Sequence, residues 1–290
     1  MHPAPSVIIF TVFSGLGFGL LFWLGIDATP PTGWVAFVFW VIAYVMAAGG
    51  LLSSTFHLGH PERFLKAFTQ WRSSWLSREG LAAVATLVAM GLYGLGLVFF
   101  AAAWQPLGWL GSLGALATVF TTSMIYTQMK TVPRWKHWTT PALFLALSLG
   151  GGALFAGKVT IAIVLLIAAG LLQAYAWFSG DSRLSDSGTT LATATGLGHI
   201  GKVRAFEPPH TGTNYLLKEF AYEVGRKHVQ QLRLIALALG FVVPVLVLLL
   251  PLGHFGAAIA VLSHIAGILA LRWLFFAQAE HVVGLYYGKR

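Results

Sequence analysis

The sequence has 290 residues, of which 57% are hydrophobic and only 9% are charged, and its formal net charge is +9. Soluble domains carry about 25% charged residues, so this composition excludes an ordinary soluble domain and indicates an integral membrane protein. The absence of cysteine excludes disulfides, thiolate zinc sites and cysteine-ligated iron–sulfur clusters in this chain. In a membrane protein, the excess of cations indicates topology and lipid contact rather than nucleic-acid binding.

Eight apolar segments are long enough to cross a bilayer, whose core takes about 17–25 residues per helix. They are expected near residues 6–26, 34–56, 79–103, 109–129, 139–157, 159–178, 230–251 and 255–277. Only Gly157 and Lys158 separate the fifth from the sixth, so a bundle of seven spans stays an alternative. The start MHPAPSVIIF lacks a basic region and a cleavage site, so the first span is expected to remain as an anchor. The sequence predicts an all-α integral membrane protein, a single bundle of about eight transmembrane helices over residues 1–290.

Lysine and arginine are distributed very unequally between the two sides of this predicted bundle. On one side Lys158 is the single cation, which leaves 17 of the 18 on the other side. Those 17 lie in segments 57–78, 130–138, 179–229 and 278–290 and at Arg233 and Arg272. Because positively charged short loops stay in the cytoplasm, both termini and these segments are expected on the cytoplasmic side of the membrane.

The segment between the second and third spans carries the most concentrated chemistry of the chain. His57 ends the second span, and Glu79 is expected to open the third. A carboxylate there has a structural interpretation, since the helix dipole stabilises it. An acid that faces a bundle interior is instead a functional candidate. A histidine and a carboxylate at the edge of lipid suit proton exchange with a quinone, which takes up two protons on two-electron reduction.

Other polar side chains on the same side could contribute to a quinone pocket. Trp71, Arg72 and Ser74 lie between His57 and Glu79, and Tyr126 and Lys130 end the fourth span. The alternative for all of them is an aromatic belt with cations that reach the interface. Arg72 has the further alternatives of an ion pair with Glu79 or a contact with a lipid headgroup.

Segment 179–229 is the longest polar stretch. It is rich in Ser, Thr, Gly and Asp, contains Pro208-Pro209, and then alternates apolar residues with Lys, Arg and Glu from 216 to 227. This pattern predicts a cytoplasmic loop with an interfacial amphipathic helix. The loop either packs on its own bundle or docks a soluble partner subunit.

The remaining histidines give a weaker signal. His264 lies inside the eighth span, and no second interior histidine matches its depth, as a bis-histidine haem b would need. We therefore expect no metal in this chain. The alternative is a haem held by His57 with His228 or His281. H-E-x-x-H and Walker motifs are absent.

Two loops resemble a known family. The first is His57-Leu58-Gly59-x-Pro61 with Arg63 and Ser77-x-Glu79, and the second is Thr131-Val132-Pro133-x-Trp135. Both resemble the membrane anchor subunit of bacterial dimethyl sulfoxide reductase, which is related to the polysulfide reductase anchor. The basic, aromatic stretch 70–79 and the start Met1-His2-Pro3-Ala4 are more similar to the anchor of the cytoplasmic-facing sulfite dehydrogenase complex.

The resemblance implies an eight-helix bundle in the bacterial inner membrane. It further implies contact with an iron–sulfur subunit, which in turn contacts a molybdopterin catalytic subunit, and electron exchange with ubiquinone or menaquinone. In the family, the histidine of the first motif and the acid that opens the next helix matter for quinol binding, which maps onto His57 and Glu79. The similarity to the sulfite anchor implies quinone reduction coupled to sulfite oxidation; menaquinol oxidation for a dimethyl sulfoxide or related reductase is the alternative.

Two other classes compete with a quinone-reactive anchor. A transporter would place ionisable residues at the midplane of two matching halves, whereas here they gather at one side. A purely structural tether would have no quinone site at all.

Overall fold

The computed structural model describes residues 1–57, 60–207, 212, 214–220 and 228–287, and within these ranges the chain forms helices and no strands. The membrane part consists of α1 (Pro5–Ile9), η1 (Phe10–Ser14) and α2 (Gly15–Gly25), which run on from one another, α3 (Gly33–Ser53), α4 (Trp75–Phe100), α5 (Gln105–Thr127), α6 (Thr139–Phe155), α7 (Val159–Gly180), the continuous α11 (Val229–Leu237), η5 (Ala238–Val242) and α12 (Val243–Leu248), and α13 (Gly253–Ala277). The all-helical membrane bundle predicted from the sequence is confirmed.

Seven of these helical stretches are long and apolar enough to cross a membrane, and α6 is a shorter apolar helix of 17 residues. Residues 156–158 separate α6 from α7, and Gly157 adopts a positive φ of 68° at this turn. The fifth and sixth apolar segments are therefore two packed helices, in contrast to the seven-span alternative that would merge them.

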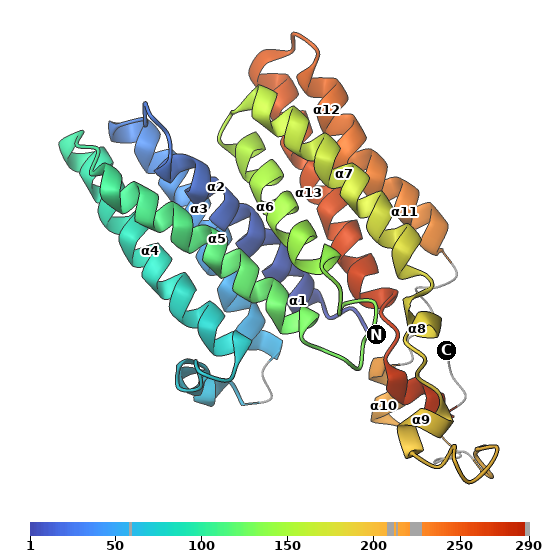
Figure 1. Ribbon diagram of the computed structural model, residues 1–290. Coiled ribbons are helices and arrows are strands. Elements are labelled where there is room, and N and C mark those ends of the chain that lie inside the picture. The colour runs from blue at the N-terminus through green and yellow to red at the C-terminus, as the bar shows by residue number, and fades with distance from the viewer. Residues whose placement is uncertain (58–59, 208–211, 213, 221–227, 288–290) are drawn as a thin grey trace.

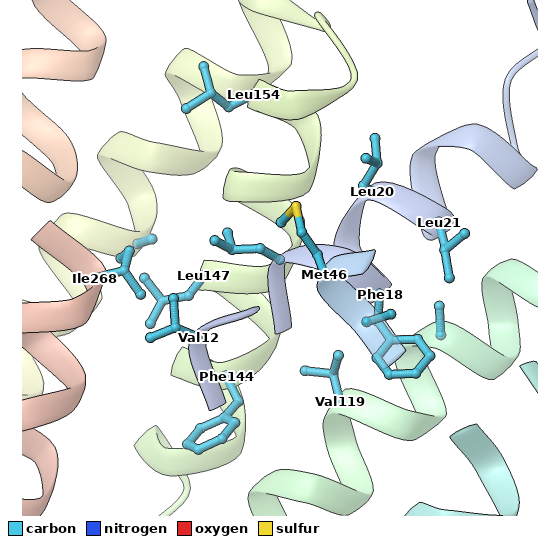
Figure 2. Packing of buried hydrophobic residues seen from close by; sticks show 14 of the residues in the cluster. Val12, Phe18, Leu20, Leu21, Met46, Val119, Phe144, Leu147, Leu154 and Ile268 are labelled. Atoms are coloured by element: carbon cyan, nitrogen blue, oxygen red, sulfur yellow. The ribbon is translucent and has the colours of Figure 1, made fainter. Parts of the chain in front are cut away.

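The first span lies at the centre of the bundle. Figure 1 shows α2 and α6 in the middle, with α3–α5 on one side and α7 and α11–α13 on the other. A helix that is apolar all round is suited to such a buried position. Close packing needs small residues here, since a Cβ on Gly152 would lie 2.2 Å from the carbonyl carbon of Gly19. Figure 2 shows Val12, Leu147 and Ile268 meeting between η1, α6 and α13.

The seventh span contains a proline that leaves backbone carbonyl groups without donors, and side chains of the eighth span supply the missing hydrogen bonds. Pro244 has no N–H, so Gly240 O, four residues earlier, lacks its usual donor. Leu239 O lacks its usual donor as well, because the Val243 N–H donates to Ala238 O in the π-turn η5. Ser263 Oγ donates to Leu239 O at 2.8 Å, and His264 Nδ1 lies 2.7 Å from Gly240 O. The interior histidine therefore has a structural role that follows from Pro244.

The two ends of the bundle differ in chemistry. The N-terminal ammonium donates to Ala279 O at 2.7 Å, so the N-terminus lies at the same end of the bundle as the end of α13, as Figure 1 shows. We call this the polar end; its described residues also include 54–57, 60–74, 128–138, 181–207, 214–220 and 228. At the opposite end Lys158 pairs with Asp27 at 2.8 Å, which neutralises the single cation of that side.

Asp181 ties three segments of the polar end together. It accepts a bidentate pair from Arg233, at 2.6 and 2.9 Å, and a third hydrogen bond from Arg134 at 2.8 Å. Burial alone would raise the pKa of Asp181, but these two guanidinium groups lower it below its ordinary value. The contacts join the end of α7 to α11 and to the loop 128–138.

The long polar segment contains the short helices α8 (Arg183–Asp186), α9 (Leu191–Thr195) and α10 (Tyr215–Phe220). The helix predicted over 216–227 coincides in part with α10, while residues 221–227 and Pro208-Pro209 lie outside the described residues. The polar end also carries η2 (Ser54–His57), η3 (Pro61–Phe68) and η6 (Val282–Tyr287).

Candidate functional site

Glu79 is buried inside the bundle at its polar end. The helix α4 begins at Trp75, because Ser74 caps it by accepting a hydrogen bond from the Ser77 amide at 3.4 Å. The prediction that Glu79 opens the span is therefore wrong by one turn. The side chain is 3% exposed and does not serve as a dipole-stabilised terminal charge.

Thr122 on α5 supplies the hydrogen-bond partner of this carboxyl group. Its Oγ1 lies 2.5 Å from Glu79 Oε1 and 2.9 Å from the Thr118 carbonyl. A threonine hydroxyl has one proton to donate, so an ionised Glu79 competes with Thr118 O for it. A protonated Glu79 instead donates to Thr122, which donates to Thr118, and both contacts are satisfied. The pair can thus hold or release one proton with little rearrangement.

Tyr126 follows Thr122 by one turn on α5 and is 7% exposed. Four aromatic rings surround it, with centroid distances of 5.3 Å to Trp135, 5.4 Å to Phe275, 5.7 Å to Phe276 and 5.7 Å to Phe144. Tyr126 therefore lies one helical turn from the Thr122–Glu79 pair, in an otherwise apolar enclosure.

The other predicted pocket residues lie at the surface of the polar end. Trp71 is 51% exposed, and the Arg72 guanidinium carbon lies 5.3 Å from its ring centroid. Lys130 is exposed, and Ser74 is used as the cap of α4. The alternative of an Arg72–Glu79 ion pair is wrong, because Arg72 stays outside while Glu79 turns inward to Thr122.

His57 ends η2, directly after α3, at the same end of the bundle as Glu79. Its side chain lies outside what the structure describes, as do Leu58 and Gly59. Its assignment stays a prediction.

The motif Thr131-Val132-Pro133-x-Trp135 closes the polar end of the bundle. Val132 and Trp135 are 0% and 2% exposed. Trp135 Nε1 donates to Phe275 O at 3.0 Å, which satisfies a carbonyl in the last turn of α13. The amide of Val282 donates to Thr131 O at 3.0 Å. The motif therefore shapes the enclosure around Tyr126 rather than projecting into water.

Sequence reasoning missed Arg272, which it placed near a helix end as a topological charge. The residue is 3% exposed within α13, and its guanidinium carbon lies 3.6 Å from the Phe144 ring centroid. The available signal was its position in a span, where an ionisable residue is a functional candidate by default. Thr122 offered no signal, since its role depends on which face α5 turns to α4.

In the described part of the chain, no group of three or more His, Asp or Glu side chains lies close enough to hold a metal ion. The polar groups that do meet inside the bundle, the Glu79 carboxyl and the Thr122 hydroxyl, suit proton transfer and hydrogen bonding.

The whole chain matches a known family. The family model for the DMSO reductase anchor subunit (DmsC) matches residues 1–288. This chain belongs to the DMSO reductase anchor subunit family. The resemblance predicted from the two loops is confirmed. The DmsC-family chain is thus a multi-pass membrane subunit of an oxidoreductase complex.

Among curated proteins, a sulfite dehydrogenase subunit from Allochromatium vinosum is 31% identical to this DmsC-family anchor over 323 aligned positions, which cover 99% of each chain. No solved structure matches the chain. In this DmsC-family anchor the described residues of the two family loops lie at the polar end, which also holds Glu79 and Tyr126.

Proposed function

We propose that this anchor passes electrons between a partner iron–sulfur subunit and the quinone pool, at a site built around Glu79 at the polar end. The observation that carries the proposal is a buried carboxyl, hydrogen-bonded to a threonine that lies one helical turn from a buried tyrosine, in a chain of this family. The likeness to a sulfite dehydrogenase subunit supports quinone reduction coupled to sulfite oxidation in a molybdopterin partner subunit.

The quinone supplies two-electron chemistry and needs two protons for each reduction. Glu79 holds a proton that it can deliver into the enclosure, and Thr122 orients it. The Tyr126 hydroxyl is a hydrogen-bond donor for a carbonyl oxygen, and His57 is the proposed donor for the second carbonyl. Protons return to Glu79 from the polar end. General acid–base groups of this kind contribute about 10²–10⁴-fold to a rate.

The proposed orientation places both termini in the cytoplasm of a bacterium and the chain in its inner membrane. The positive-inside rule supports it, since the sequence predicts 17 of its 18 cations on the side of the polar end. The pairing of Lys158 with Asp27 strengthens the asymmetry, because the opposite side then carries no unpaired lysine or arginine in the described chain.

The polar end is also the proposed docking face of the iron–sulfur subunit. Exposed apolar side chains stand on its otherwise polar segments: Phe56 is 85% exposed, Ile200 75% and Phe206 92%. Singly exposed apolar residues are common on protein surfaces, and it is the partner subunits expected of this family that make these three side chains candidates for a docking contact. Docking there would bring the partner's terminal cluster to the same end as Glu79.

A second candidate is a menaquinol-oxidising anchor of a dimethyl sulfoxide or related reductase, which the name of the matching family favours. It uses the same site with electrons and protons moving in the opposite direction. Purified complex that reduces quinone with sulfite, and does not oxidise quinol with dimethyl sulfoxide, would decide for the first candidate.

The test compares quinone-coupled turnover with turnover of an artificial dye in the intact complex. Glu79→Gln is expected to lower quinone-coupled turnover by about 10²-fold or more and His57→Ala to do the same, with dye-coupled turnover unchanged. Thr122→Val, which loses the Glu79 contact, should lower it less, by about tenfold.

Thr121→Val is the matched control, because Thr121 Oγ1 bonds only to carbonyls of its own helix, at Ala117 and Thr118. Its quinone-coupled turnover should equal that of the unaltered chain. Full quinone-coupled turnover in both Glu79→Gln and His57→Ala would remove the site assignment.

A further inference from the structure

A polar cavity lies between α6, α7 and α13 at the polar end, and no step of the proposed quinone chemistry uses it. Its volume is about 40 Å³, which is room for about three water-sized groups. It is lined at opposite sides by Arg134, Arg183 and Arg272, together with the polar side chains of Thr139, Gln173 and Gln278. The described lining contains no carboxylate.

Two of these arginines present an unused donor. The Nε atoms of Arg134 and Arg272 are buried and have no hydrogen-bond partner among the described residues. Arg272 is 3% exposed, and its guanidinium group lies over the face of the Phe144 ring. A buried donor without a partner carries a desolvation penalty, which is larger when the group is charged. Such a group needs an explanation, for example an ordered water, a bound ion or a ligand in the cavity.

The field in the cavity is positive. Arg183 donates through Nη1 to the Arg134 carbonyl at 3.0 Å and through Nη2 to Ser179 at 2.6 Å. Burial, followed by the charge of Arg134, lowers the pKa of Arg183. Asp181 is already engaged by Arg134 and Arg233. The charges of Arg183 and Arg272 therefore call for an additional anion.

The position of the cavity indicates the source of that anion. Trp138 and Tyr175, which directly precede the lining residues Thr139 and Ala176, form a ring pair at 5.9 Å and are 56% and 47% exposed. Exposed Trp and Tyr pairs mark the level of the lipid headgroups in membrane proteins. The cavity thus lies at the depth of lipid phosphate groups, on the side where anionic lipids attract basic residues.

We infer that this cavity binds a phosphate oxyanion, supplied by the headgroup of an anionic phospholipid, with Arg272 and Arg134 as its buried donors. The bound phosphate satisfies both Nε groups and neutralises the cavity. It also locks α6, α7 and α13 together beside the Tyr126 enclosure, since Phe144 contacts both sites.

The experiment uses the full-length chain, with the subunits that co-purify, in two kinds of nanodisc. One contains phosphatidylglycerol, and the retained lipid is counted by native mass spectrometry. The other contains only phosphatidylcholine, and inorganic phosphate is added while thermal unfolding is followed. The variants are Arg272→Gln and Arg134→Gln. Lys136→Gln is the matched control, since Lys136 is an exposed cation on the same loop as Arg134.

We expect one tightly retained phosphatidylglycerol in the unaltered chain and in Lys136→Gln, and at least tenfold less retention in Arg272→Gln and Arg134→Gln. Stabilisation by inorganic phosphate alone, lost in the same two variants, would assign the site to free phosphate. If Arg272→Gln does not fold, Arg134→Gln and Gln173→Leu carry the comparison. Equal retention and equal stabilisation in all variants would overturn the inference.

Discussion

At the scale of single residues, Glu79 could be predicted and its partner could not. A carboxyl beside a predicted span is conspicuous in a chain with 9% charged residues. Its hydrogen bond to Thr122 depends on the rotation of α5 against α4, and both helices are apolar on every side, so periodicity does not define their faces. The same reason hid Arg272. A cation at the edge of a span gives one sequence signal whether it snorkels outward or points inward.

The hydrogen bonds that Asp181 accepts from Arg134 and Arg233 give a pH-dependent prediction. Because Arg233 and Arg134 hold the pKa of Asp181 below its ordinary value of 3.8, its contribution to stability is complete at neutral pH and is lost as the pH falls through and below that value. Asp181→Asn should therefore lower the unfolding temperature at pH 7, and the difference from the unaltered chain should shrink below about pH 4. The effect is expected to be at most about 1 kcal/mol, since the side chain is 48% exposed.

The measurement is thermal unfolding in detergent from pH 3 to pH 8, with Asp186→Asn as control. Asp186 accepts only from Ser182 in the described contacts. A difference between Asp181→Asn and the unaltered chain that grows toward acid pH would contradict the assigned role.

At the scale of helices, the sequence predicted all the spans but misplaced several ends. Hydropathy defines where a segment becomes polar, whereas the observed helices end where caps and turns allow. Ser74 caps α4, which begins at Trp75, four residues before the predicted 79. The hydrogen bonds from α13 to the carbonyl groups near Pro244 could not be predicted either, because they depend on the register of α13 against the proline-containing helix. In the sequence His264 is a lone interior histidine, whereas in the structure its hydrogen-bond partner is the Gly240 carbonyl.

This hydrogen bond predicts a coupling between His264 and Pro244. His264→Leu leaves the Gly240 carbonyl without its donor and should destabilise the chain by about 1–3 kcal/mol. In a Pro244→Ala background the helix regains an N–H for that carbonyl, so the same His264→Leu change should cost about 1 kcal/mol less. The change in side-chain volume is common to both backgrounds and cancels in the cycle.

Thermal unfolding of the four proteins measures this coupling. Equal costs of His264→Leu in both backgrounds would show that the hydrogen bond to Gly240 does not repair the proline.

At the scale of the whole molecule, composition and the distribution of charge predicted the class, the bundle and its two unlike ends. What they could not predict is which helices meet. The central position of α2 and α6, as Figure 1 shows, follows from close contacts such as Gly19 with Gly152. These contacts join residues more than 130 positions apart, which local patterns do not encode.

The proposed orientation can be tested in cells with single cysteines, because the chain has none of its own. A membrane-impermeant maleimide should label Thr29→Cys in intact cells with a permeable outer membrane. It should label Ser187→Cys only after the inner membrane is opened. Both positions are exposed in the structure, at opposite ends of the bundle. The reverse pattern would place the polar end outside the cytoplasm.

The most direct test of the central claim is photolabelling of the intact complex with an azido-quinone, followed by identification of the modified peptides. The account predicts labels within residues 54–79 and 122–135, which contain His57, Glu79 and Tyr126, and loss of those labels when unlabelled quinone is added. Competable labels confined to the Lys158 end of the bundle, around residues 27–33 or 156–158, would contradict a quinone site at Glu79.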